Sequence, residues 1–481
     1  MTFQKILLGA IVLALAWGVL AFGAVYPWAY TTLAIACAAV GGVGLVTGRN
    51  RKAASTRLTI GLMTIAFAIA LQLVPLPRRA LTSLSPATDT FLSQSDFSYM
   101  RPANNAEPSD FVDPSSLPWR PISIDPAKTV LGLGLFGAFA LFLLGATRTI
   151  SNVGARPLAM AVMFLGILIT VLALIQLAIN PNAREFTLIY GFWRPKYVST
   201  PFGPFVNPNH YAGWMLMALP LVFGLGYGTF ERARLDAPPG VSHPGRFAMA
   251  EEGGFVALCA FAFLVMGVSL VMTRSRSGIA CLAIATALPG ALIARRQPSA
   301  RARASVVAAL ALLLLGAVSW AGVDNLIIKF QSTQSARVSR LGAWRDTLHI
   351  IADSPLTGTG FDTYGRAMEL YQTPPRTVYF LEAHNDYLQI LAEGGLLVGL
   401  PVLVVVVIFA GDVQRRFKEA PKTGLTYWLR VGAVVGLVSV AVQSLVEFSL
   451  QMPGNAAFFA VLAAIALHRS PRLTPKFKPT T

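Results

Sequence analysis

Cysteine and acidic residues are scarce in this sequence, and each shortage excludes a class of protein. Only three cysteines occur in 481 residues, each within an apolar run, so their spacing predicts neither a disulfide framework nor a zinc site. Asp and Glu number 22 against 39 Lys and Arg, and charged residues make up 13% of the chain, about half the share of a soluble domain, where it is about 25%. There is also no dinucleotide fingerprint, Walker motif or internal repeat, which disfavours an ATP-driven transporter.

Apolar residues, in contrast, make up 54% of the chain. One soluble core could not bury that much apolar surface, so we expect an all-α polytopic membrane protein. A net charge of +17 would suit a nucleic-acid partner, but the basic residues are dispersed through short loops between apolar runs. We therefore expect contact with membrane lipids and no nucleic acid.

Twelve apolar runs approach the roughly 20 residues that a helix needs to cross a bilayer. The even-numbered connections and the two termini hold 23 of the 39 Lys and Arg but only 6 of the 22 Asp and Glu. Because short basic loops stay in the cytoplasm, both termini should be cytoplasmic. We interpret the first run as a retained helix rather than a signal peptide. The expected spans are 6–26, 28–47, 58–76, 128–147, 157–179, 210–229, 253–272, 277–294, 304–321, 387–411, 431–449 and 454–468.

Two extracytoplasmic connections are long, and long loops are usually functional or disordered. The first is polar with almost no apolar period, which predicts a flexible cover. The second should fold, since apolar residues recur at helical spacing over 339–351 before a segment rich in Gly and Pro ends the helix. The expected organisation is N-terminal helices 1–76, a flexible loop 77–127, a membrane core 128–321, a helical loop domain 322–386, and C-terminal helices with a cytoplasmic tail 387–481.

Two arginines, Arg274 and Arg276, stand in a break of a few polar residues between two spans. Guanidinium pairs well with phosphate because it is always charged and donates a two-pronged hydrogen bond. The competing interpretation is a pair of arginines that bond lipid headgroups from the membrane surface. Their position on the extracytoplasmic side, against the charge bias, favours a function.

Arg340 and Trp344 lie four residues apart on the helix expected in the long loop, so they share a face. Arg340 could reach a ligand while Trp344 anchors the helix. The alternative is a solvated helix whose arginine pairs with a neighbouring carboxylate.

His384 stands where the long loop re-enters the membrane, flanked by Glu382, Asn385, Asp386 and Tyr387. An imidazole at this boundary can take a proton from an attacking hydroxyl near neutral pH, and Glu382, Asp386 or Glu393 could orient it. A structural histidine is the alternative, although polar neighbours are costly at a membrane boundary unless they are used.

A loop dense in Pro and Gly leads into the span at 210–229 and ends in Asn207, Asn209 and His210. These side chains could line a ligand site or could only cap and anchor the helix. Glu447 falls within an expected span, where a carboxylate needs a partner; Gln443 and the arginines are candidates.

With these four motifs the chain resembles the O-antigen ligase family, which includes lipid A-core O-antigen ligases, O-antigen and exopolysaccharide polymerases, and protein O-oligosaccharyltransferases. The resemblance covers roughly 202–450 and depends on the order and spacing of the motifs. The long polar insert at 77–126 has no counterpart in the pattern.

The resemblance implies metal-independent transfer of a glycan, without a cofactor, from undecaprenyl diphosphate to an acceptor hydroxyl on the periplasmic face of the bacterial inner membrane. Arg276 and Arg340 would hold the diphosphate and His384 would activate the acceptor. Ligation onto a lipid A core and polymerisation onto another lipid-linked glycan remain open.

Two other classes also remain. Twelve spans would fit a secondary transporter or a flippase for a lipid-linked glycan, although no inverted repeat is detected. A non-enzymatic scaffold would leave Arg276, Arg340 and His384 without a shared purpose.

Overall fold

The protein is helical throughout the part of the chain that the computed structural model describes. The described residues are 2–48, 55–96, 99, 119–179, 188–195, 200–236, 251–296, 299–301, 303–305, 308, 311, 333–373 and 379–469. Within them every regular secondary-structure element is a helix, and the only β-structure consists of three isolated bridges. The all-α class predicted from the composition is confirmed for these residues.

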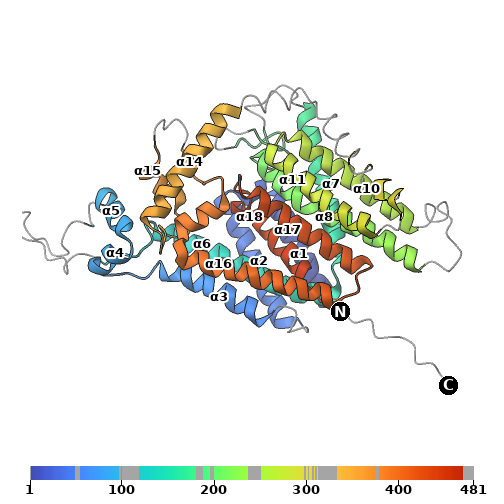
Figure 1. Cartoon of the computed structure of the whole chain (residues 1–481), viewed down its shortest axis with the longest axis horizontal. Coiled ribbons are helices and arrows are strands. Elements are labelled where there is room, and N and C mark those ends of the chain that lie inside the picture. The colour runs from blue at the N-terminus through green and yellow to red at the C-terminus, as the bar shows by residue number, and fades with distance from the viewer. Residues whose placement is uncertain are drawn as a thin grey trace, which may run out of the picture.

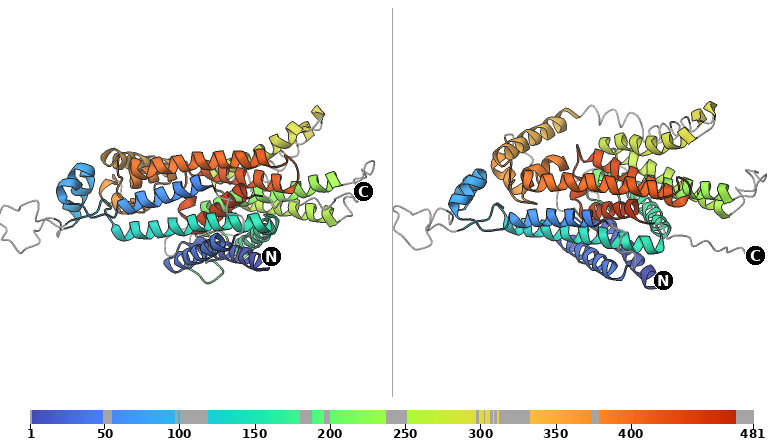
Figure 2. Two further views of the ribbon diagram at one scale, coloured as in Figure 1. Left: turned by 90° about the horizontal axis from the view of Figure 1, so that it is seen from below. Right: turned by 60° about the horizontal axis from the view of Figure 1, so that its bottom comes forward.

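Nine of the described helices are long and apolar enough to cross a membrane, and two shorter apolar helices accompany them. They lie side by side in one bundle (Figure 1, Figure 2). The expected span 304–321 falls mostly outside the described residues, so the total of twelve stays a prediction. The long helices are α1 (Thr2–Leu20), α2 (Pro27–Thr47), α6 (Pro126–Val153), α7 (Arg156–Ile179), α8 (Pro208–Asp236), α10 (Glu251–Met272), α11 (Arg276–Arg296), α16 (Asp386–Glu419) and α17 (Leu425–Gln443), and the shorter ones are α3 (Thr56–Leu71) and α18 (Pro453–Leu467).

Burial separates the helices of the bundle into central and peripheral ones. The apolar stretch of α8 is 83% buried, whereas that of α16 is only 17% buried. Leu396, Leu400, Leu403 and Val407 of α16 are all more than half exposed. In a helix of this length and composition, such a face is suited to lipid rather than to water.

Three expected spans end too late. Helix α1 ends at Leu20 rather than at residue 26, α3 ends at Leu71 rather than at residue 76, and α17, expected at 431–449, begins earlier and ends at Gln443. An apolar run continues past each of these ends, but the backbone leaves the helix. After α17, for example, the carbonyl of Leu445 accepts from the Asn385 side chain.

Four helices outside the bundle gather at one end of it, opposite the N-terminus (Figure 2). They are α4 (Arg78–Leu84), α5 (Pro86–Ser95), α14 (Thr333–Asp353) and α15 (Tyr364–Tyr371). Residues of all four helices pack with Ala392 of α16 in a separate hydrophobic core, called the loop core below. It includes Leu81, Phe91, Ile350, Tyr364 and Met368. The helix expected at 339–351 is therefore present within α14, and the segment 77–127, expected to be a flexible loop, begins with two packed helices.

Helix α16 is interrupted near its start, and the interruption receives the segment that follows α14. Gly395 has φ 53° and ψ −153°, and a Cβ at this position would lie 2.6 Å from the backbone of Leu356. The carbonyl of Glu393 accepts from the Gly360 amide (2.9 Å) and from the fully buried Gln72 side chain (2.8 Å). The first turns of α16 are thus bonded to the loop core as well as to the bundle.

Helices α2 and α6 touch through two glycines, and this contact predicts a strong effect of a single methyl group. A Cβ at Gly145 would lie 2.1 Å from the carbonyl oxygen of Gly41, so Gly145→Ala forces the helices apart. We expect a loss of about 1–3 kcal/mol, seen as a lower Tm of the detergent-solubilised protein. Gly137→Ala, on the same helix with nothing within 4 Å, is the control; equal Tm values for the two variants would contradict the packing argument.

Candidate functional site

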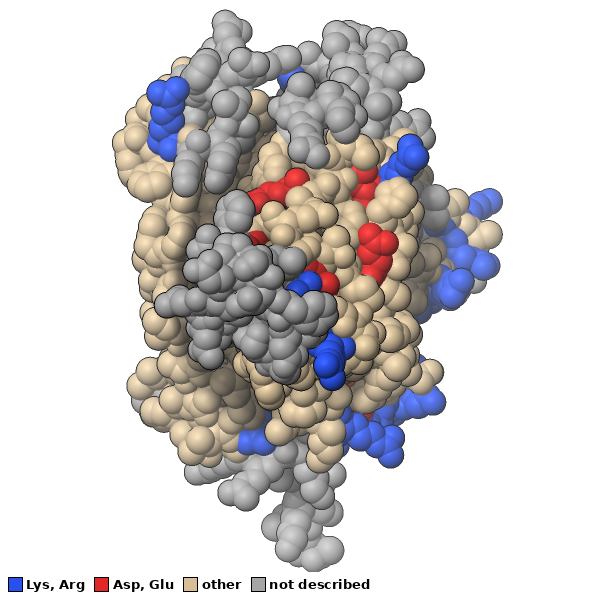
Figure 3. Space-filling view, turned by 90° about the vertical axis from the view of Figure 1, so that its left-hand side faces the viewer, with Lys and Arg blue, Asp and Glu red and all other residues tan. Residues whose placement is uncertain are grey.

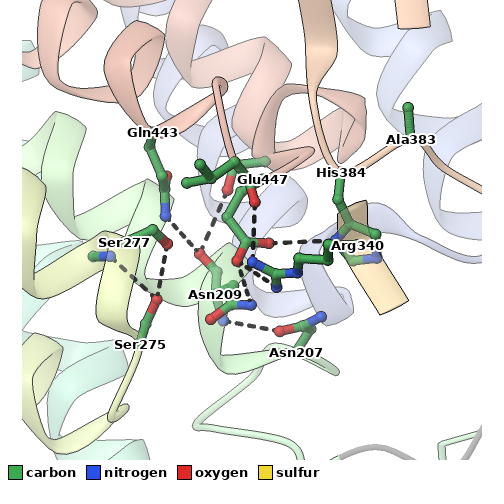
Figure 4. A network of polar contacts seen from close by, with 12 residues as sticks. Asn207, Asn209, Ser275, Ser277, Arg340, Ala383, His384, Gln443 and Glu447 are labelled. Atoms are coloured by element: carbon green, nitrogen blue, oxygen red, sulfur yellow. Dashed lines mark hydrogen bonds and ion pairs between the residues drawn. The ribbon is translucent and has the colours of Figure 1, made fainter. Parts of the chain in front are cut away.

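The polar residues singled out in the sequence meet at the end of the bundle that carries α14 and α15. Figure 4 shows the cluster, which draws on the start of α8, the turn before α11, helix α14, and the connections that precede α16 and follow α17. Acidic side chains are also visible in the middle of this end face (Figure 3). Segments more than two hundred residues apart in the chain, such as Asn209 and Glu447, are in direct contact here.

Glu447 is the centre of the cluster. Its side chain is 2% exposed, and its Oε1 accepts from Arg340 Nη2 (2.8 Å) and from Asn209 Nδ2 (2.9 Å). Its Oε2 faces Nδ1 of His384 at 3.7 Å, which is longer than a hydrogen bond. Burial raises the pKa of Glu447, but His384 and Arg340 outweigh it, and the pKa falls below its ordinary value. The carboxylate is therefore ionised at neutral pH.

Arg340 reaches Glu447 from α14. Its Nη1 also donates to the carbonyl of Val446 (3.1 Å), and its side chain is 34% exposed. One turn further along the helix, Trp344 Nε1 donates to the carbonyl of Ala383 (3.0 Å). The two residues face the same region, as their spacing predicted, and together they fix α14 against the segment that carries His384.

His384 is held in an unusual backbone conformation, with φ at 52°. Such positive φ values are uncommon for residues other than glycine and often occur at functional sites. Its ring packs edge-on against Phe448, with centroids 4.6 Å apart, and its side chain is 22% exposed. Asn385 follows as the N-cap of α16 and binds the carbonyl of Leu445 through Nδ2 (2.9 Å). The imidazole is therefore both fixed and reachable from outside.

The start of α8 supplies Asn209 to the cluster. Asn207 Oδ1 accepts from the Asn209 amide (2.9 Å), which is a helix-capping arrangement. Gln443 Nε2 donates to the Asn209 carbonyl (3.4 Å). His210 is buried, and its ring packs against Phe448, the same ring that His384 contacts, with centroids 4.8 Å apart. Of the three residues predicted here, Asn209 contacts Glu447, Asn207 caps the helix, and His210 supports Phe448.

Arg276 begins α11, close to the cluster. Ser275 Oγ accepts from the Gly278 amide (3.2 Å), and a Cβ at Gly278 would lie 2.7 Å from Ala212 of α8. This close packing brings the start of α11 to the start of α8. The charges of Arg276 and Arg340 are near enough to repel each other. Arg274 lies in the preceding turn with φ 55°.

The remaining predicted residues hold the segment in place. Glu382 Oε2 accepts from Gln389 Nε2 (2.5 Å), Asp386 Oδ1 accepts from Gln451 Nε2 (3.3 Å), and Tyr387 OH donates to the carbonyl of Ala441 (2.8 Å). We expected Glu382, Asp386 or Glu393 to orient His384, but the carboxylate that faces its Nδ1 is that of Glu447. The carboxylates of Glu382, Asp386 and Glu393 are engaged elsewhere. They accept hydrogen bonds from Gln389, from Gln451, and from the amides of Asp362 and Tyr364, respectively.

Glu447 was missing from the residues predicted to form the site, although the sequence signalled it. A carboxylate in an apolar run needs a partner, and Gln443 and the arginines were the candidates. The partner is Arg340, and Gln443 binds Asn209 instead. In addition, α17 ends at Gln443, so Glu447 lies in the connection to α18 rather than inside a span.

A second polar cluster, centred on Glu393, joins the start of α16 to the loop core. Glu393 accepts from the amides of Asp362 (2.9 Å) and Tyr364 (3.1 Å). Burial, with the charges of Asp362 and Asp386, raises the pKa of Glu382 to about 8. Burial also raises the pKa of Asp362 to about 6. Among the described residues, no group of three or more His, Cys, Asp or Glu side chains could hold a metal ion.

The fold and this cluster define a polytopic helical membrane protein with cationic groups, an imidazole and a buried carboxylate at one end of its bundle. Residues 261–403 match the family model described as O-antigen ligase. The resemblance predicted from the motifs is confirmed over these residues. The matched segment includes Arg276, Arg340 and His384 but not Asn209 or Glu447. No curated protein matches the chain.

The raised pKa of Glu382 predicts how stability depends on pH. Between the ordinary pKa of about 4.5 and about 8 the folded protein keeps a proton that the unfolded chain releases, so the free energy of unfolding falls as the pH rises across this range and stops falling above about 8. We expect the Tm to fall between about pH 5 and about pH 8, and Glu382→Gln to flatten that fall. Glu369→Gln, an exposed carboxylate of α15, is the control; an unchanged slope in Glu382→Gln would refute the assignment.

Proposed function

We propose that this protein transfers a glycan from undecaprenyl diphosphate to an acceptor hydroxyl at the periplasmic face of the bacterial inner membrane. The O-antigen ligase family match suggests a glycosyltransferase of the ligase or polymerase type. The observation that carries the finer proposal is the cluster in which Glu447 joins Arg340, His384 and Asn209, with Arg276 nearby.

The cluster suits a lipid-borne diphosphate. A diphosphate that leaves water needs more than one cation to offset its desolvation, and Arg276 and Arg340 both lie at the end of the bundle where a lipid headgroup would sit. Guanidinium groups fixed by the fold stabilise the charge that develops on the leaving diphosphate. When no donor is bound, the negative charge of Glu447 offsets part of the positive charge of the two arginines.

The transfer step uses His384 as the general base. The acceptor hydroxyl gives its proton to the imidazole, its oxygen forms a bond to the anomeric carbon, and the bond between that carbon and the phosphate oxygen breaks. The electron pair leaves with undecaprenyl diphosphate, whose negative charge the arginines stabilise. The energy for the reaction is already stored in the donor, so the cluster needs only to position the reactants, accept one proton and stabilise the charge of the leaving diphosphate.

The arrangement of the helices supports a site on the periplasmic side. The cluster lies at the end opposite the N-terminus (Figure 2), and the charge bias of the connections predicts a cytoplasmic N-terminus. The acceptor is either a lipid A core, in a ligase, or a second lipid-linked glycan, in a polymerase, since both reactions use the same donor.

Reconstitution tests the proposal directly. The purified protein in proteoliposomes receives lipid-linked glycan extracted from a strain that lacks this gene, with either a lipid A core or no added acceptor. Glycosylated lipid A core indicates a ligase, and longer lipid-linked chains indicate a polymerase. Movement of the intact donor across the bilayer without any new glycosidic bond would support the flippase alternative instead.

Replacement of the imidazole is expected to abolish transfer. His384→Asn keeps a polar side chain but cannot accept the proton, and a general base contributes roughly 10²–10⁴-fold to the rate. The initial rate of transfer in proteoliposomes measures the loss, and size-exclusion profiles check that the variant is intact. Transfer at the wild-type rate by this variant would remove His384 from the mechanism.

Lysine should replace the cluster arginines poorly. Arg340→Lys and Arg276→Lys keep the charge but lose the planar pair of donors that matches phosphate, so we expect roughly tenfold or greater losses in kcat/KM for the donor. Arg345→Lys, at an exposed position of the same helix α14, is the control. Full activity of either cluster variant would make that arginine a surface charge only.

A further inference from the structure

The two oxygens of Glu447 have different surroundings. Oε1 accepts two hydrogen bonds, from Arg340 and Asn209, while Oε2 is buried and makes no hydrogen bond within the described residues. Nδ1 of His384, 3.7 Å away, is also buried without a hydrogen-bond partner there. An unmade bond between two buried polar atoms costs free energy, and an approach of less than 1 Å would form it.

From this geometry we propose that Glu447 is a positioning residue that couples occupation of Arg340 by the donor diphosphate to the basicity of His384. The proposal rests on the proposed function and adds a residue to its mechanism. With no donor bound, Arg340 neutralises the carboxylate. When the diphosphate binds, it competes for the guanidinium, and the carboxylate then bonds His384 Nδ1–H through Oε2.

The coupling follows from the charges involved. A carboxylate that bonds Nδ1–H fixes the imidazole in the tautomer whose Nε2 is free to accept a proton, and it stabilises the imidazolium that forms. Asn209 is uncharged and keeps hold of Oε1 while Arg340 shifts. The exposed third of the Arg340 side chain gives the diphosphate access to it. The base is therefore strongest when the donor is in place.

Other titratable groups belong to the same cluster. Arg340 reaches Glu447 from α14, Arg276 begins α11, His210 packs on Phe448 from α8, and Asp386 begins α16. Of the carboxylates in the described part of the chain, that of Glu447 faces His384 Nδ1. Its removal should therefore change the pH dependence in a known direction.

Glu447→Gln is the decisive variant, since it keeps the shape and removes the charge. We expect kcat to fall roughly 10- to 100-fold, as for other residues that orient a catalytic group, while KM for the donor stays the same or falls because Arg340 has lost a competitor. The acidic limb of the kcat profile should move to lower pH, because the imidazolium loses the carboxylate that stabilises it. Undecaprenyl diphosphate alone, titrated by intrinsic fluorescence, should bind at least as tightly as to the wild type.

Glu231→Gln is the matched control. Glu231 is also a mostly buried carboxylate with several donors, namely Arg296, Trp428 and the Gly424 amide. It lies 22 residues along α8 from Asn209, about 33 Å away at 1.5 Å per residue. We expect the pH profile and the KM of this variant to match the wild type, even if its Tm falls. Glu447→Asp keeps the charge and should recover part of kcat, which also serves if Glu447→Gln proves unstable.

The outcomes separate this proposal from the proposed function. If the wild-type protein forms no new glycosidic bond in the reconstitution, the proposed function fails. If the wild type is active and His384→Asn transfers glycan at the same rate, His384 is not the base and the coupling fails with it. If His384→Asn is inactive but Glu447→Gln keeps the wild-type kcat and pH profile, only the coupling is overturned. A proportional loss of kcat and of undecaprenyl diphosphate affinity, with an unshifted pH profile, would show a merely structural role and would also overturn it.

Discussion

A buried, ionised carboxylate is the constraint on which the site depends. Taking a charge out of water is expensive unless partners compensate it, and the side chain of Glu447 is almost fully buried. Arg340 and Asn209 must therefore converge on it, and with them α14 and the start of α8. The cluster thus serves as a structural joint between the loop core and the bundle, and removal of either charge leaves the other unpaired at the boundary.

The sequence predicted those features that depend on local pattern. Apolar length alone located eleven helices of the expected bundle, and the period of apolar residues around Trp344 located α14. The residue types suited to the chemistry, Arg340 and His384, could also be found, because guanidinium and imidazole groups at a membrane boundary are rare enough to stand out. These are properties that a few neighbouring residues determine by themselves.

Features that depend on distant partners could not be predicted in this way. Arg340 and Glu447 are 107 positions apart, and nothing in either local pattern identifies the other. The end of α17 and the fold of the residues that follow it are determined by the bonds that Arg340 and Asn385 make to them. Gln72 is a similar case: its side chain crosses to Thr357, Glu393 and Phe361, although in the sequence it only seemed to continue a span.

The interruption at Gly395 divides α16 into two mechanical parts. The nine residues 386–394 are bonded to the loop that follows α14, and the long part beyond Gly395 exposes a row of leucine and valine side chains. His384 directly precedes the short part. Backbone hydrogen bonds join the loop to Ala392 and Glu393 on one side of the glycine and to Leu396 and Leu397 on the other. The direction of the segment that carries His384 is therefore set relative to the long helix by the loop, which splints the break in place of continuous helical hydrogen bonds.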